Sequence, residues 1–291
     1  MSVVLDAAQW RAARAEHEAA VDALLAAHRA RRARGEPHPV ADFLFSYYSH
    51  RPARLRRWYP GLGVALADAE EVLALPGHEL GPDGVEVAAA AVERRRSTVE
   101  FVARLLRATT DRPARLGCFG MHEWAMVYGG GTDAARHDVP LRLGPAGTDA
   151  AVEQVGLRCT HHDAFRFFTP AARPRNDTTP TREDQVAREQ PGCLHAGMDL
   201  YKWSYKLEPL VPSSLVLAAF RHAAAARELD MRASPYDLTA WGYAPVRVET
   251  AAGRAEYVRA QTALAAGAAP VRAALLAVCE QALQRSGTVC V

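Results

Sequence analysis

Amphipathic helical spacing at both ends of the chain constrains the fold most strongly. Apolar residues recur every three or four positions over long stretches, which is typical of helices that bury one face. Between these stretches, residues 117–212 contain few periodic runs and many Gly, Pro, His and aromatic residues in short clusters. Loop-dense segments of this kind carry function more often than they carry the core. The spacing predicts helices over residues 6–34, 40–48, 85–110, 213–229, 253–267 and 270–285, and short strands over residues 139–143 and 245–249.

These elements predict a mainly α fold with minor β structure. Of the 291 residues, 49% are hydrophobic and 23% are charged, which is ordinary for a globular protein that buries a sizeable core. We therefore expect a single compact multi-helical domain over residues 1–291. It would comprise N-terminal helices (1–115), a loop-rich functional segment (116–212) and C-terminal helices (213–291). The formal net charge of +2 does not by itself indicate a nucleic-acid partner.

The ends of the chain and its cysteines indicate a cytoplasmic protein. No basic segment followed by an apolar run stands at the start, and no stretch reads as long and apolar enough to span a bilayer, so we expect no membrane contact. The cysteines are odd in number, widely spread and without a CxxC pair, which favours reduced thiols over disulfides or a structural zinc site. They are Cys118, Cys159, Cys193, Cys279 and Cys290. No obligate protein partner is evident.

Lysine is nearly absent from the chain, which has 33 Arg, two Lys, one Asn (Asn176) and no Ile. Because Arg can replace Lys in most ion pairs, a retained Lys indicates a role for a compact, titratable ammonium group. Lys202 and Lys206 share one face with His195 and Asp199 if this segment is helical. The candidate roles are a phosphate contact, a polarising charge or an imine-forming amine. An ordinary Asp–Lys helix pair is the structural alternative.

A carboxylate between an imidazole and an indole is the first candidate for chemistry. Glu123 follows His122 and precedes Trp124 in the otherwise apolar stretch GCFGMHEWAMVY. Burial would raise the pKa of such a carboxyl and suit it to general acid or base catalysis. The structural alternative is a Glu123 paired with an Arg, with Trp124 in the core.

The second candidate is the segment Cys159–Asp163 (CTHHD), which is followed by several aromatic residues. Adjacent histidines point in different directions, so at most one of His161 and His162 would face a given site. The spacing matches no established metal motif. The structural alternative is an imidazole bonded to a carboxylate inside a packed turn.

Two further segments could contact phosphate groups. Residues 169–183 form a proline-rich loop whose arginines could hold phosphates or carboxylates, or could simply be solvated. Pro60–Gly63 resembles the hairpin of helix–hairpin–helix DNA-binding elements. Asp83 lies downstream, roughly where glycosylases of that superfamily carry a catalytic Asp.

Several of these segments resemble an actinobacterial family carried under the name 3-methyladenine DNA glycosylase. The similar stretches extend over most of the chain. They are His38–Gly63 (HPVADFLFSYYSHRPARLRRWYPGLG), Gly117–Tyr128 (GCFGMHEWAMVY), Cys159–Asn176 (CTHHDAFRFFTPAARPRN), Glu189–Leu207 (EQPGCLHAGMDLYKWSYKL) and Leu229–Leu238 (LDMRASPYDL). The resemblance implies a DNA-repair hydrolase that begins base excision by cleaving the N-glycosidic bond of an alkylated purine, with DNA carrying that base as its partner.

Such a reaction needs a carboxylate, an aromatic pocket for the flipped base and groups that hold the backbone, but no cofactor. Glu123 and Asp199 are the leading catalytic carboxylates, with Asp163 and His122 as further catalytic candidates. The candidates for base stacking are Trp124, Phe167, Tyr201 and Trp203. The candidates for phosphate binding are Lys202, Lys206, Arg173, Arg175 and Asn176.

A metal-dependent hydrolase or oxygenase acting on a small molecule is the alternative. His122, His161, His162 and His195 could join nearby carboxylates in a two-histidine, one-carboxylate site for one divalent metal such as Zn or Fe. A non-enzymatic nucleic-acid or partner-binding protein is a third possibility.

Overall fold

The computed structural model describes residues 2–130 and 139–287. Helices dominate, with one small sheet, which confirms the predicted mainly α fold with minor β structure. The α-helices of the described residues are α1 (Ala7–Ala33), α2 (Phe43–Tyr47), α3 (Pro52–Arg56), α4 (Ala89–Glu93), α5 (Arg96–Thr110), α6 (Met121–Ala125), α7 (Gly144–Val155), α8 (His162–Phe165), α9 (Gln185–Arg188), α10 (Leu194–Lys206), α11 (Ser213–Arg232) and α12 (Ala251–Gly287).

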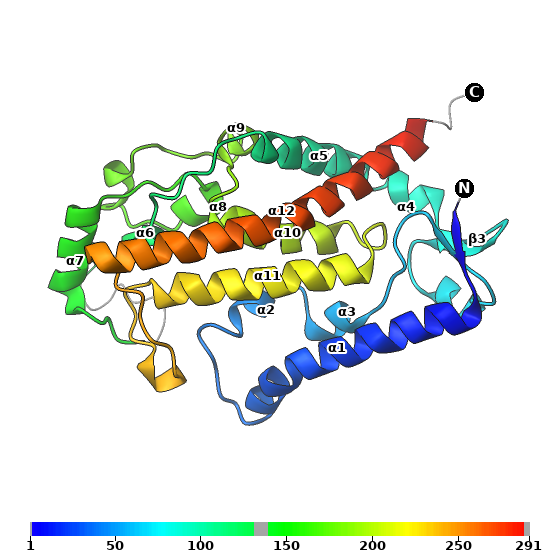
Figure 1. The fold of residues 1–291 in the computed structure, drawn as a ribbon, viewed down its shortest axis with the longest axis horizontal. Helices are drawn as coiled ribbons and strands as arrows, with labels where there is room; N and C mark the ends of the chain where they lie inside the picture. The colour runs from blue at the N-terminus through cyan, green and yellow to red at the C-terminus, as the bar shows by residue number, and fades with distance from the viewer. Residues whose placement is uncertain (1, 131–138, 288–291) are drawn as a thin grey trace.

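Three long helices form the centre of the molecule. Helix α10 packs against both α11 and α12, and α12 also packs against α5 (Figure 1). Helix α1 lies along the opposite edge, where it contacts α3 and α11. Because α10 is enclosed by its neighbours, most of its residues from Leu194 to Tyr201 are buried, including polar ones. This central position places the polar residues of α10 in the interior.

The sheet packs near the start of α1 and was largely missed by the sequence pattern. Its strands are β1 (Val3–Leu5), β2 (Val64–Leu66), β3 (His78–Gly81) and β4 (Gly84–Val87), in the order β1-β2-β4-β3. β1 pairs with β2 in parallel and the other pairs are antiparallel. The prediction of one helix over residues 85–110 is therefore wrong at its start, where β4 and the separate helix α4 precede α5.

Both predicted strands, residues 139–143 and 245–249, are wrong. Leu141 forms only an isolated bridge with Tyr236. Each segment contains a proline, which lacks the amide hydrogen needed for a strand ladder. The neighbouring amides instead bond to loop or helix-end carbonyls, as Arg142 N–H does to Pro235 O and Val246 N–H does to Arg232 O.

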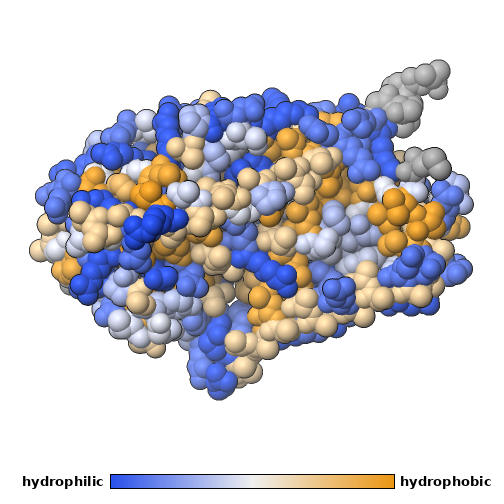
Figure 2. Space-filling view, viewed as in Figure 1, coloured by the Kyte–Doolittle hydropathy of each residue, from blue (hydrophilic) through white to orange (hydrophobic). Residues whose placement is uncertain are grey.

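The two predicted C-terminal helices are a single helix, α12, that continues through Pro270. Buried residues before and after the proline, among them Ala268 and Leu275, pack on the core and hold the helix together. By length and composition the span Ala251–Arg285 could cross a membrane, since an 18-residue window within it has a mean hydropathy of 1.6, so the expectation that no stretch is long and apolar enough is wrong. Core helices of soluble proteins meet the same criterion. The outer face of α12 carries exposed alanines and contributes to the pale orange surface in Figure 2.

The predicted helix–hairpin–helix resemblance at Pro60–Gly63 is also wrong. This segment connects α3 to strand β2, so no helix follows it. The Leu62 amide bonds to Leu210 O, and the positive φ of Gly61 lets the backbone pass against Pro212. Asp83 lies exposed in the turn between β3 and β4.

Candidate functional site

Ionisable side chains from five parts of the chain, most of them buried, meet around α10 and form two adjacent clusters. His195, Asp199 and Lys202 are four and three residues apart on α10, so they share one face of that helix. Arg227 and Asp230 are three residues apart on α11 and also share a face. The Asp230 cluster consists of His122 and Glu123 from α6, His195 from α10, and Arg227 and Asp230 from α11. The Asp199 cluster consists of Tyr48, His161, Asp163, Glu189, Asp199 and Lys202.

In the Asp230 cluster, one arginine holds two carboxylates. Arg227 Nη1 donates hydrogen bonds to Glu123 Oε1 at 2.6 Å and to Asp230 Oδ2 at 2.9 Å. His122 Nε2 lies 2.7 Å from Asp230 Oδ1, an ion-pair distance, yet neither atom has a hydrogen bond of acceptable geometry. The ring of His195 packs edge-on against that of His122, with centroids 4.5 Å apart.

The pKa values of the two histidines in this cluster are shifted in opposite directions. Burial lowers the pKa of His122, but the Asp230 carboxylate outweighs burial and leaves the pKa above its usual value. For His195, burial and the neighbouring His122 place the pKa well below its usual value. His195 is therefore neutral near pH 7, the form in which an imidazole binds a metal ion.

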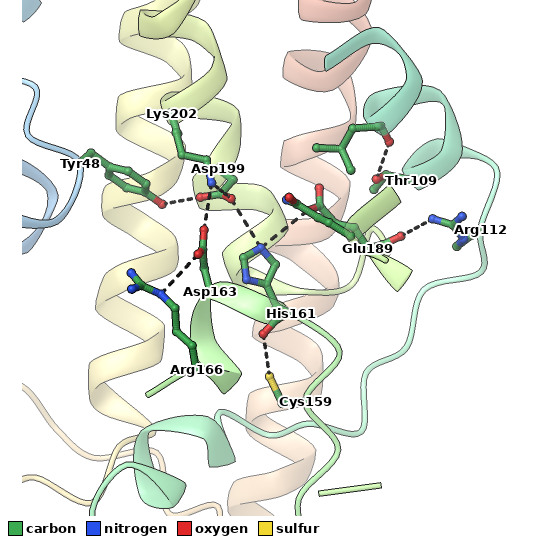
Figure 3. A network of polar contacts seen from close by, with 12 residues as sticks. Tyr48, Thr109, Arg112, Cys159, His161, Asp163, Arg166, Glu189, Asp199 and Lys202 are labelled. Atoms are coloured by element: carbon green, nitrogen blue, oxygen red, sulfur yellow. Dashed lines mark hydrogen bonds and ion pairs between the residues drawn. The ribbon is translucent and has the colours of Figure 1, made fainter. Parts of the chain in front are cut away.

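Figure 3 shows the Asp199 cluster, in which Asp199 lies at the centre. Tyr48 donates a hydrogen bond to Asp199 Oδ1 at 3.1 Å, and Lys202 bonds to Asp199 Oδ2. Lys202 Nζ also lies 3.2 Å from Asp163 Oδ2. His161 Nε2 is 3.5 Å from Asp199 Oδ2 and 3.7 Å from Glu189 Oε2. Both ring nitrogens of His161 are buried without a hydrogen bond.

The charges in this cluster are strongly perturbed. Burial would raise the pKa of Asp199, but Lys202 and His161 hold it far below its usual range. The pKa of Lys202 is raised despite burial, because of Asp199 and Asp163. Lys202 is thus a fixed cation, so its placement favours a structural or polarising charge over an imine-forming amine. Burial raises the pKa of Glu189, and the neighbouring Asp199 carboxylate raises it further.

His195 separates two cavities. One, of about 140 Å³, is lined by Cys118, Cys159 and Cys193 together with His122 and His195, with arginines among the other lining residues. The second, of about 50 Å³, is lined by aromatic and charged side chains and by His195. These are Phe43, Tyr47, Phe167, Glu123, Asp163 and Arg227.

The thiols that line the larger cavity should be poorly reactive. Burial raises the pKa of the Cys159 thiol to about 12, so its thiolate fraction at pH 8 is roughly a thousandfold below that of an unperturbed cysteine. We expect iodoacetamide to label Cys159 far more slowly in the folded protein than in urea, as measured by peptide mass spectrometry. Equal labelling rates in the two states would contradict this expectation.

Two sets of three side chains have the composition and spacing to hold a metal ion. In His122, His195 and Asp230, one potential ligand atom from each residue lies within 4.8 Å of the other two. The same is true of His161, Glu189 and Asp199. All six side chains are buried.

The structure brings together most of the predicted catalytic and metal-binding residues, with one clear exception. His122, Glu123, His161, Asp163, His195 and Asp199 all belong to the two clusters. His162 does not, because its ring turns to the carbonyl of Pro180, 3.3 Å from Nδ1. As expected for adjacent histidines, only His161 faces the site.

The residues predicted to stack on a base are dispersed. Trp124 is fully buried and donates its indole N–H to Ala233 O, and Tyr201 is fully buried against His50. Trp203 packs between its own helix's lysines and Phe101. Of the four, only Phe167 lines a cavity among those described above.

The residues predicted to hold phosphate are dispersed too. Arg173 donates to Arg166 O, and Arg175 donates to the Glu153 carboxylate. The Asn176 carboxamide bonds both to the N–H and to the C=O of Cys159, so it fixes the chain just before His161. Lys202 is engaged by carboxylates. Lys206 lines a separate surface cavity of about 330 Å³ together with Arg54, Arg57 and Arg95.

Several residues of the site were not predicted from the sequence, among them Asp230, Arg227, Glu189 and Tyr48. The sequence does contain a signal for Arg227 and Asp230. Arg227 and Asp230 fall on the apolar stripe of α11 that includes Phe220 and Ala223, where charged residues are expensive unless paired. Tyr48 and Glu189 lie at the ends of short elements, and no periodicity relates them to α10.

Comparison of the chain with protein-family models, with curated proteins and with solved structures found no match. The geometry of the two clusters therefore carries the functional argument.

Proposed function

We propose that the protein is a metal-dependent enzyme that acts on a small molecule, and that His122, His195 and Asp230 hold a divalent transition-metal ion. The observation that carries this proposal is the convergence of these three side chains in the interior. His122 Nε2 and Asp230 Oδ1 lie 2.7 Å apart there, close enough to be neighbouring ligands of one ion, but they are poorly aligned for a hydrogen bond to each other. Poorly aligned buried polar atoms are costly, and a metal ion bound by both would remove that cost.

The type of ligand supports a transition metal. Two imidazoles and one carboxylate suit zinc and iron, whereas calcium and magnesium prefer oxygen ligands alone. Three protein ligands leave coordination positions open for water or substrate. The cavity of about 140 Å³ adjoins His122 and His195, so a small molecule, or the reacting end of a larger one, could reach the ion. Zinc would favour a hydrolase and iron an oxygenase.

Metal analysis of the purified protein tests this proposal. We expect zinc or iron in stoichiometric amount in the wild type, and loss of this ion in Asp230→Asn and in His195→Gln. Asp237→Asn changes a half-buried aspartate outside both clusters that bonds to Thr239; it is the matched control and should retain the metal. Metal-free wild-type protein that cannot be loaded with zinc or iron would overturn the proposal.

Excision of an alkylated purine is the second candidate, supported by the position of Glu123 beside the small cavity that contains Phe43, Tyr47 and Phe167. Here the aromatic rings would contact the base and Glu123 would act as the carboxylate. Arg227 is bonded to this carboxylate and would have to share it with substrate.

For this candidate, Glu123→Gln should retain folding and DNA binding and abolish release of methylated purine, as measured by mass spectrometry of the freed bases. Unchanged release would move the catalytic role to Asp163 or Asp199. Release that continues in a chelator would separate this activity from the proposed metal site, and no release by the wild type would exclude this candidate.

A further inference from the structure

We infer that a second divalent ion binds between His161, Glu189 and Asp199, so that the interior holds a two-metal centre. The inference rests on the proposed function, since it adds an ion beside the one held by His122, His195 and Asp230. The two ligand sets are neighbours. The ring of His195 lies 4.5 Å from that of His122 and 5.3 Å from that of His161, measured between centroids.

The ligand geometry of the second set is the first support. His161, Glu189 and Asp199 are at most 3% exposed, and one potential ligand atom from each lies within 4.8 Å of the others. His161 Nε2 faces both carboxylates at distances too long for a hydrogen bond (Figure 3). An ion between these atoms would give the imidazole a direct bond in place of these two longer contacts.

The charge of the interior is the second support. Five carboxylates belong to the two clusters, and the permanent cations that pair with them are Arg227, Lys202 and Arg166, whose Nε lies 3.4 Å from Asp163 Oδ1 (Figure 3). Two negative charges are left over when all five carboxylates are ionised, so the interior favours divalent cations. Two divalent ions would leave two net positive charges, which suits a bound hydroxide or an anionic substrate.

Lys202 contacts two carboxylates, so it can release one of them to the second ion and keep the other. Its ammonium group is bonded to Asp199 Oδ2, an oxygen the ion would use, and it also lies 3.2 Å from Asp163 Oδ2. When the ion binds, Lys202 would keep Asp163 as its partner and release Asp199. Neither the lysine nor the aspartate would then be left as an unpaired buried charge.

Zinc stoichiometry tests the inference. Full-length protein stripped with a chelator is reloaded with zinc, freed of excess metal, and analysed by mass spectrometry of the metal. The wild type should hold two ions per chain, and Glu189→Gln and Asp230→Asn should hold one each. Glu100→Gln, an exposed glutamate on α5, should still hold two. If Glu189→Gln does not fold, as judged by circular dichroism, His161→Gln replaces it.

The other outcomes separate the two claims. One ion per wild-type chain that is lost in Asp230→Asn and unaffected in Glu189→Gln would overturn the second site and leave the proposed function standing. One ion that is lost only in Glu189→Gln would overturn both the proposed ligand set and the two-metal centre. No bound ion in any variant would overturn both claims.

Discussion

Arg227→Met should lower the free energy of unfolding by about 3–5 kcal/mol, because it leaves two carboxylates buried without their cation. The Arg227 side chain is 1% exposed, and one of its nitrogens bonds to both Glu123 and Asp230. The guanidinium also stacks on Phe43 at 3.8 Å from the ring centroid. Met fills a similar volume, so the loss reports the charge more than the packing. Urea unfolding in a chelator, followed by circular dichroism, measures the difference.

Arg107→Met is the matched control for this prediction. Arg107 also pairs with a glutamate, Glu280, at 2.8 Å, but both side chains are more than 40% exposed. Water screens exposed pairs, so this change should cost less than about 1 kcal/mol. Adding Glu123→Gln to Arg227→Met should restore part of the lost stability, since it removes one of the two uncompensated charges. A cost for Arg227→Met as small as the control's would show that this buried network does not stabilise the fold.

The helices could be predicted from the sequence where one face is apolar. The periodicity over residues 6–34 and 213–229 marks α1 and α11 to within a few residues. The sheet could not be predicted this way, because its strands have three or four residues, too few for an alternating pattern to be distinguished from a turn. The prediction of two C-terminal helices failed for a different reason: packing on either side of Pro270 keeps α12 continuous.

The candidate site could be predicted only where its residues share one helix. Helical spacing from His195 placed Asp199 and Lys202 on the same face, and both lie in the Asp199 cluster. The partners of this face come from distant segments. Asp230 is brought in by α11 and His161 by the loop that Asn176 fixes, and these long-range contacts leave no local pattern in the sequence.

The rarity of lysine and asparagine indicates positions with unusual surroundings, and for Lys202 the contacts fit the polarising charge or the Asp–Lys helix pair among the predicted alternatives. Lys202 contacts carboxylates and Asn176 contacts backbone, and neither contact involves a free surface. Arg is longer and planar, and its fork would not fit between Asp199 and Asp163 as a compact ammonium does. Retention of Lys202 is thus explained by the shape of a buried charge site.

Lys202→Met should destabilise the metal-free protein strongly and make its stability depend on added divalent ions. In a chelator, Asp199 and Asp163 lose their shared cation, and removing one partner of a buried ion pair costs about 3–5 kcal/mol. With zinc present, an ion between His161, Glu189 and Asp199 no longer competes with the ammonium group for Asp199. The rise in melting temperature on adding zinc should therefore be larger in Lys202→Met than in the wild type, because ligands that bind only the folded state stabilise it in proportion to their affinity.

Lys206→Met is the matched control, because it changes the chain's other lysine one helical turn away, where the side chain is exposed and outside the two clusters. It should shift the melting temperature little, and zinc should stabilise it as much as the wild type. A Lys202→Met protein that is as stable as the wild type in a chelator would show that Asp199 does not need this cation. An unstable Lys202→Met protein that zinc does not rescue would instead make Lys202 a purely structural counter-ion, and the Asp199 cluster a site without a metal.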